Sequence, residues 1–194
     1  MIIRSTALAL GFSILGATSA LADCKSDIQS FMKSMETSPP YRVDMSVVSG
    51  DNTMKMQGEA IMPHSIHMKS NVMEMVMTPN GVWMGQGGKL QKSPPQMQEQ
   101  VQSMIKQGMN IGVESVEAAE CLGSADFEDG TYDHYKYVSN TAFMGIATTV
   151  KVDVYLNSHQ RPVWMVIDGE AMGTKSVTTQ HIVYDNSISI ADPE

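Results

Sequence analysis

The chain has 194 residues, and its 13 lysines and arginines stand against 21 aspartates and glutamates, a formal net charge of −8. An acidic chain is a poor partner for the phosphates of nucleic acids and for anionic membrane surfaces, so we expect no nucleic-acid partner. The length is sufficient for one domain with a sizeable hydrophobic core.

Residues 1–22 are typical of a secretory signal peptide. Arg4 precedes an apolar run, and residues 20–22 form a small-residue end of the A-x-A type. This pattern predicts cleavage after residue 22, a periplasmic location, and a mature single domain over residues 23–194. No other apolar run approaches the roughly 20 residues that span a bilayer.

Two cysteines, Cys24 and Cys121, remain in the mature chain. Export to an oxidising compartment makes a disulfide between them the default expectation. This bond would attach the N-terminal helix to a strand far along the sequence. Two free thiols acting as metal ligands are the alternative, and the lack of a CxxC motif gives no support to a thioredoxin-like redox role.

Two segments, Asp23–Thr37 and Gln96–Met109, have the apolar periodicity of amphipathic helices. Proline pairs at 39–40 and 94–95 mark the end of the first helix and the start of the second. The first apolar stripe consists of Ile28, Phe31, Met32 and Met35. The second consists of Met97, Val101, Met104 and Ile105.

The other segments alternate apolar and polar residues with the period of two that is typical of half-buried strands. Turn signals such as Asn80-Gly81 and Asp129-Gly130 separate them. The pattern predicts an α+β fold, in which an antiparallel meander precedes the inserted helix, a second meander follows it, and the helices cover the apolar face. The expected strands are Tyr41–Val48, Thr53–Met62, His64–Ser70, Val72–Thr78, Val82–Gly85, Lys89–Lys92, Ala119–Phe127, Thr131–Ser139, Thr148–Asn157, Val163–Asp168 and Lys175–Tyr184, with a short edge strand at Ile188–Ile190.

The stretch Thr53–Met84 holds eight methionines, and most of them fall on one face of their strands. Three interpretations of this sulfur-rich face stay open: a packed core, a cavity for a flexible apolar ligand, and a copper site. Thioether side chains repack easily around apolar ligands, and they also suit Cu(I). Neighbours at i and i+2 on a strand lie about 6.6 Å apart, so a copper site requires two strands to converge.

His64 and His67 are the best further candidates for metal ligands, but a spacing of three on a strand points them to opposite faces. We therefore expect both to be exposed surface histidines. No nucleophile motif or phosphate-binding loop is present, and the acidic residues Asp126, Glu128 and Asp129 are typical of a charged hairpin tip. We expect a protein without catalytic activity or a resident cofactor.

Several segments, taken in order, resemble a known family. They are the signal peptide, the N-terminal helix, Gly58–Pro63 (GEAIMP), Thr78–Trp83 (TPNGVW), Val152–Tyr155 followed by Gln160-Arg161-Pro162, and Tyr184–Ile190. Their order and turn positions are similar to those of the LolA/LolB-like periplasmic carriers that localise lipoproteins. The resemblance spans nearly all of residues 25–194 and implies an incomplete antiparallel β-barrel, with helices as a lid over a concave apolar interior that holds acyl chains. Arg42 is the only early candidate for a family arginine, and the methionines depart from the usual aromatic and aliphatic lining.

The expected function is therefore non-catalytic binding and carriage of a lipid or of lipoprotein acyl chains, exchanged with membrane-bound donor and acceptor proteins. The ligand would displace the helices. Its expected contacts are Val43, Met45, Met54, Met56, Met68, Met73, Met75, Met77, Trp83, Met97, Val101, Met104 and Ile105. A periplasmic copper-binding protein is the first alternative, with Met54, Met56, His67, Met68, Met73, Met75 and Met77 as ligands. A structural interaction module with a filled core is the second.

Overall fold

A computed structural model of the chain describes residues 17–103, 116–143, 146–171 and 173–194. Helix α1 (Ala17–Met35) comes first, and a second helix begins at residue 95 and is described to residue 103. The strands are β1 (Tyr41–Ser49), β2 (Asn52–Ile61), β3 (Ser65–Ser70), β4 (Glu74–Thr78), β5 (Gly81–Gln86), β6 (Lys89–Lys92), β7 (Val116–Phe127), β8 (Gly130–Phe143), β9 (Ile146–Leu156), β10 (Pro162–Ala171) and β11 (Thr174–Tyr184). Within the described ranges, no helix is both long and apolar enough to cross a membrane.

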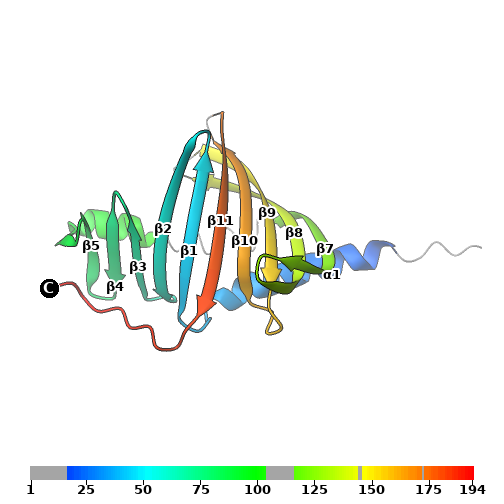
Figure 1. Cartoon of the computed structure of the whole chain (residues 1–194), viewed down its shortest axis with the longest axis horizontal. Helices are drawn as coiled ribbons and strands as arrows, with labels where there is room; N and C mark the ends of the chain where they lie inside the picture. Colours follow the sequence, from blue (N-terminus) through cyan, green and yellow to red (C-terminus); the bar gives the residue numbers. More distant parts are fainter. Residues whose placement is uncertain (1–16, 104–115, 144–145, 172) are drawn as a thin grey trace, which may run out of the picture.

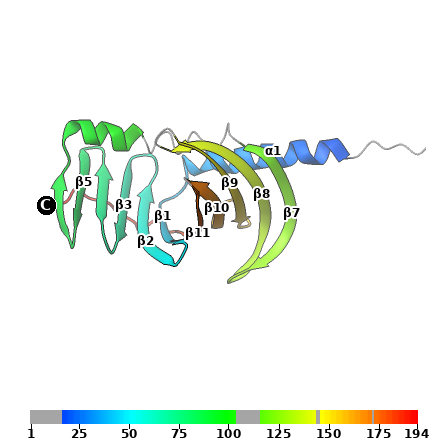
Figure 2. The ribbon, with the colours of Figure 1, turned by 90° about the horizontal axis from the view of Figure 1, so that it is seen from above.

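The strands form one antiparallel sheet in the order β6-β5-β4-β3-β2-β1-β11-β10-β9-β8-β7 (Figure 1). Every strand pair joins neighbours in sequence, except at the seam where β1 pairs with β11. The end strands β6 and β7 lie at opposite edges, so the sheet is not closed. Figure 2 shows the strong curvature of β7, β8 and β9. The predicted α+β architecture with a large, curved, open antiparallel sheet is confirmed.

Every long predicted strand is present, with ends that shift by a few residues, but the edge strand expected at Ile188–Ile190 is wrong. Both edges of β1 are already paired, to β2 and β11, so the tail finds no free edge there. It runs below the strand ends instead (Figure 1). Asp185 accepts a hydrogen bond from Arg42 at 2.7 Å, and Asp192 accepts one from the Asn80 amide at 2.8 Å.

Helix α1 packs its apolar stripe against β7–β10, as predicted. Ile28 is fully buried and Phe31 is 4% exposed, in a cluster that includes Val152, Val154 and Leu156. The predicted disulfide between Cys24 and Cys121 is present and joins α1 to the edge strand β7, with the two Cα atoms 5.5 Å apart. The helix begins at residue 17, earlier than predicted, and is continuous through the expected cleavage point.

The register defines two faces of the sheet. Val154 of β9 packs in the α1 cluster and starts a row of residues that lie opposite one another on successive strands. The row continues with Met165 on β10, Gln180 on β11, Met45 on β1 and Met56 on β2. We call this side the helix face, because the helix at 95–103 also lies on it (Figure 2). The other side is the open face.

Candidate functional site

Cross-strand pairing gathers the methionines of β1–β5 on the helix face. Met45 lies opposite Met56, while Met68, Met75 and Met84 form a continuous row across three strands. Residues directly opposite have Cβ atoms about 5 Å apart, so these side chains contact one another. We call this surface the methionine wall. It consists of Val43, Met45, Val47, Met54, Met56, Ala60, Ile66, Met68, Met73, Met75, Met77, Val82 and Met84.

The wall is closed at one end and open at the other. In the row nearest the start of β1, Ala60 is 5%, Met77 4% and Val82 0% exposed. At the opposite end, Met54 is 39% and Met73, just before β4, is 43% exposed. Between the ends, Gly58 leaves room for its neighbours, because a Cβ there would lie 3.0 Å from Cγ1 of Val43. The wall thus grades from packed core into accessible apolar surface.

Most of the predicted ligand-binding residues share this wall, but Trp83 does not. It lies between Val82 and Met84 in β5, so strand alternation turns it to the open face, where it is 8% exposed and Nζ of Lys92 lies 5.1 Å from the centre of its ring. Met97 and Val101 belong to the helix at 95–103. The predicted contacts Met104 and Ile105 lie outside the described residues. The expected ligand contacts leave out Met84 and Ile66, which the strand register places on the wall.

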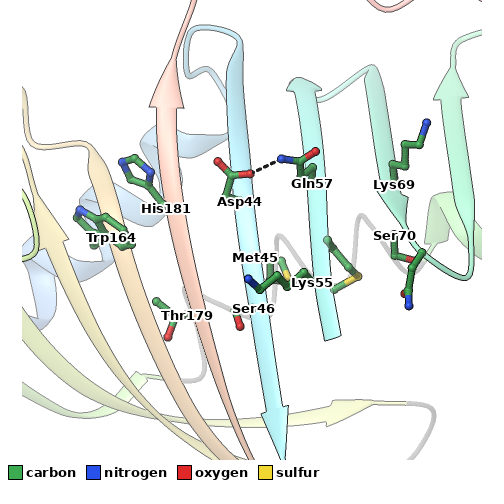
Figure 3. A pocket seen from close by; sticks show the side chains of 12 residues that line it. Asp44, Met45, Ser46, Lys55, Gln57, Lys69, Ser70, Trp164, Thr179 and His181 are labelled. Atoms are coloured by element: carbon green, nitrogen blue, oxygen red, sulfur yellow. Dashed lines mark hydrogen bonds between the residues drawn. The ribbon is translucent and has the colours of Figure 1, made fainter. Parts of the chain in front are cut away.

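The open face carries a hollow of about 720 Å³ over β1–β3, β10 and β11 (Figure 3). Figure 3 shows one cross-strand row running through it, made of Trp164, His181, Asp44, Gln57 and Lys69. The Gln57 amide donates to Asp44 at 3.0 Å, and the rings of Trp164 and His181 stack with centroids 4.1 Å apart. These groups are engaged with one another along the row. The hollow thus combines these paired polar groups with apolar surface, since Met45 and Met56 also line it.

The β7–β8 hairpin tip fixes the tryptophan of this row. Nε1 of Trp164 donates to Asp129 at 3.0 Å, and the Tyr132 hydroxyl donates to the same oxygen at 2.7 Å. These hydrogen bonds hold the pKa of the Asp129 carboxyl below its usual range. Phe127 packs edge-on against the Trp164 ring, with centroids 5.7 Å apart. The acidic tip is thus structural, in agreement with the sequence interpretation.

Next to the hollow, His67 pairs with Glu74 at 2.9 Å and is half-buried, so the expectation that His67 is an exposed surface histidine is wrong. Its side chain is 33% exposed and that of Glu74 is 10% exposed, whereas His64 is exposed as predicted. The hydrogen bond with His67 lowers the pKa of Glu74 against the opposing effect of burial. His67 lies on the open face, away from the methionines of the proposed copper set. In the described part of the chain, no three His, Cys, Asp or Glu residues gather closely enough to hold a metal ion.

Arg42 bridges two carboxylates on the same open face. Its guanidinium lies 2.9 Å from Glu59 and 2.7 Å from Asp185, and half of its side chain is exposed. The charged pairs therefore lie on the side of the sheet opposite the methionine wall. This separation leaves the wall almost purely apolar.

Comparison with known proteins gives a likeness of fold. No protein-family model matches the chain, and no curated protein sequence is significantly similar to it. Among solved structures, the crystal structure of lipoprotein LppX from Mycobacterium tuberculosis is similar, with a TM-score of 0.55 and 6% sequence identity. The likeness covers 88% of this chain and 99% of that one. The two chains thus share a fold.

Proposed function

We propose that this chain is a non-catalytic extracytoplasmic carrier that binds the acyl chains of a lipid or lipoprotein against the methionine wall. The observation that carries the proposal is the graded exposure of the wall, from buried Met77 to the accessible Met54 and Met73. Apolar surface that is contiguous with a core and accessible at one end is the kind of surface that binds apolar ligands.

Thioether chemistry and charge both support an acyl ligand. Unbranched methionine side chains change rotamer at low cost, so the wall can adapt to chains of different shape. Burial of apolar area contributes about 25 cal/mol per Å², from which the cost of ordering the ligand is subtracted. The ion pairs on the opposite face leave the wall free of charged groups that an acyl chain would have to desolvate.

The compartment and the fold support the same proposal. The signal-peptide pattern of residues 1–22 and the disulfide between Cys24 and Cys121 fit an oxidising compartment. The large, curved, open antiparallel sheet agrees with the half-barrel that the LolA/LolB-like resemblance implies. In this proposal the helix at 95–103, with Val101 half-buried, is the lid that the acyl chain displaces, and membrane-bound proteins deliver and accept the ligand.

Native mass spectrometry of protein purified from its own periplasm tests the proposal. A lipid-sized adduct is expected, and it should be lost when Met68 and Met75 are both replaced by serine. Leu122→Ser is the matched control, because Leu122 is 47% exposed on β7, away from the wall. The proposal is wrong if no adduct is found and added lipids do not bind the purified wild-type protein. It is also wrong if lipids bind the double variant as tightly as they bind the wild type.

Copper binding is the second candidate, because adjacent strands do bring methionines together. Met68, Met75 and Met84 lie side by side across β3, β4 and β5, which supplies the convergence that one strand lacks. Three thioethers suit Cu(I). This candidate would be supported over the carrier by a wild-type protein that carries the mass of one copper ion and no lipid adduct. The copper should be lost in the Met68 and Met75 double variant.

A further inference from the structure

Gln180 is a polar residue in the apolar helix face. It lies on β11 between Met165 of β10 and Met45 of β1, and it is half-buried. Thr178, two residues earlier on the same face, lies between Ile167 and Val47. Since Met165 and Ile167 pack against the α1 cluster, the two polar residues mark the border between that cluster and the methionine wall.

Within the described part of the chain, neither the Gln180 amide nor the Thr178 hydroxyl hydrogen-bonds to another residue through its side chain. The polar residues of the open face behave differently, since Asp44 and Gln57 bond to each other and Glu74 bonds to His67. A polar group without such a partner hydrogen-bonds with water in the free protein. A ligand that displaces this water and offers no hydrogen bond in its place binds with a less favourable free energy. An apolar ligand that covers β11 would therefore be penalised, unless it carries a polar group at this position.

We propose that Gln180 binds the ester carbonyl of the acyl ligand, which places the head of the ligand at β11 and its chain along the wall toward β5. This inference rests on the proposed function and names the ligand class within it, an acyl ester in preference to a plain alkyl chain. The Nε2 group of a glutamine donates hydrogen bonds, and an ester carbonyl accepts them. The Thr178 hydroxyl is a second donor on the same strand.

The dimensions of the sheet agree with this placement. Five strand spacings separate β11 from β5 in the sheet order. At about 4.8 Å each they span about 24 Å, about one strand spacing more than an extended palmitoyl chain reaches, so such a chain would extend from β11 to about β4. In register, a chain anchored at Gln180 would cross Met45 and Met56, pass Ser70 on β3 and reach Met73 just before β4, with Met68 and Met75 in the neighbouring row.

A matched pair of lipids tests the proposal. Palmitoyl lysophosphatidylcholine and its hexadecyl ether analogue differ only in the ester carbonyl, and calorimetric titration below their micellar concentrations measures both affinities. We expect wild-type protein to bind the ester about three- to tenfold more tightly, the effect of one neutral hydrogen bond. Gln180→Met, which keeps the shape of the side chain, should lower the ester affinity to that of the ether. Gln57→Met on the open face should leave the preference unchanged.

An infrared measurement reports the contact directly. The carbonyl band of a ¹³C-labelled ester should lie at lower frequency on wild-type protein than on the Gln180→Met variant. Equal affinities of the wild type for ester and ether, or a preference that survives in Gln180→Met, would overturn the role of Gln180 and leave the carrier function standing. Failure of both lipids to bind would instead remove the proposed function and this inference together.

Discussion

The disulfide provides the sharpest test of how α1 is held on the sheet. Cys24 lies in the core cluster and is 6% exposed, whereas its partner Cys121 is exposed. Replacing Cys121 by serine therefore removes the crosslink, while the buried Cys24 side chain keeps its packing. The resulting change in the free energy of unfolding reports the crosslink itself.

The expected loss is large. The crosslink joins residues 97 positions apart. In the chain-entropy model, opening a loop of this size costs about 4.7 kcal/mol at 25 °C. Small domains are stable by roughly 5–15 kcal/mol in total, so Cys121→Ser should remove a third or more of the stability. The dependence of the unfolding free energy on urea should steepen, because the unfolded chain without the crosslink exposes more surface.

Urea denaturation followed by circular dichroism, with and without reductant, measures both effects. Wild-type protein should become as unstable as Cys121→Ser when reductant is added, and the variant should not respond to reductant. A loss below about 1 kcal/mol in Cys121→Ser would refute the chain-entropy estimate for this loop. If reductant also changes the stability of Cys121→Ser, then the effect of reductant on the wild type is not due to the crosslink alone.

Three further predictions concern the packing and the ion pairs. Ile28→Ala should cost about 2–5 kcal/mol in urea denaturation, because Ile28 is fully buried and its loss leaves a cavity; a cost below 1 kcal/mol would contradict the close packing of α1. The pKa of Glu74 is lowered in the folded protein, so the stability that it contributes is present above its ordinary value of 4.5 and is lost as pH falls through the lowered folded pKa. Glu74→Gln should therefore flatten the acid side of the stability–pH curve, and an unchanged curve would show that the pair with His67 has no such role. Arg42→Gln should remove the attachment of the C-terminal tail at Asp185 while that at Asp192 remains, seen as moderately faster proteolysis of the tail, with Lys33→Gln as an exposed control; equal cleavage in both variants would contradict the bridging role of Arg42.

The strands were predictable because alternation is a local property. Val150 to Leu156 and Tyr41 to Val47 alternate with polar residues, and both sets face the helix side of the sheet. The disulfide was predictable from the count of cysteines together with the expectation of export. The side on which Trp83 lies also follows from alternation within β5, once Val82 is placed on the wall.

The features that escaped prediction depend on residues that are distant in the sequence. The row through Trp164, His181 and Asp44 exists only because β1 pairs with β11, and no local pattern predicts a pair such as Asp44 and His181, which lie far apart in the sequence. Ile188–Ile190 has the composition of a strand but finds no free edge nearby. Gln180 is an ordinary polar residue in the sequence, and it becomes notable only when its neighbours Met45 and Met165 are known.

The pairing of β1 with β11 also determines the order in which strands can pair during synthesis. Every other strand pair joins sequence neighbours, so each hairpin of the first meander can close as soon as its second strand has been made. The second edge of β1 stays unpaired until the last strand has been made, since its partner begins at residue 174. An unpaired strand edge is a template for pairing with other chains. The nascent chain is therefore most prone to association just before its final twenty residues emerge, and a truncation before residue 174 should produce an aggregating species.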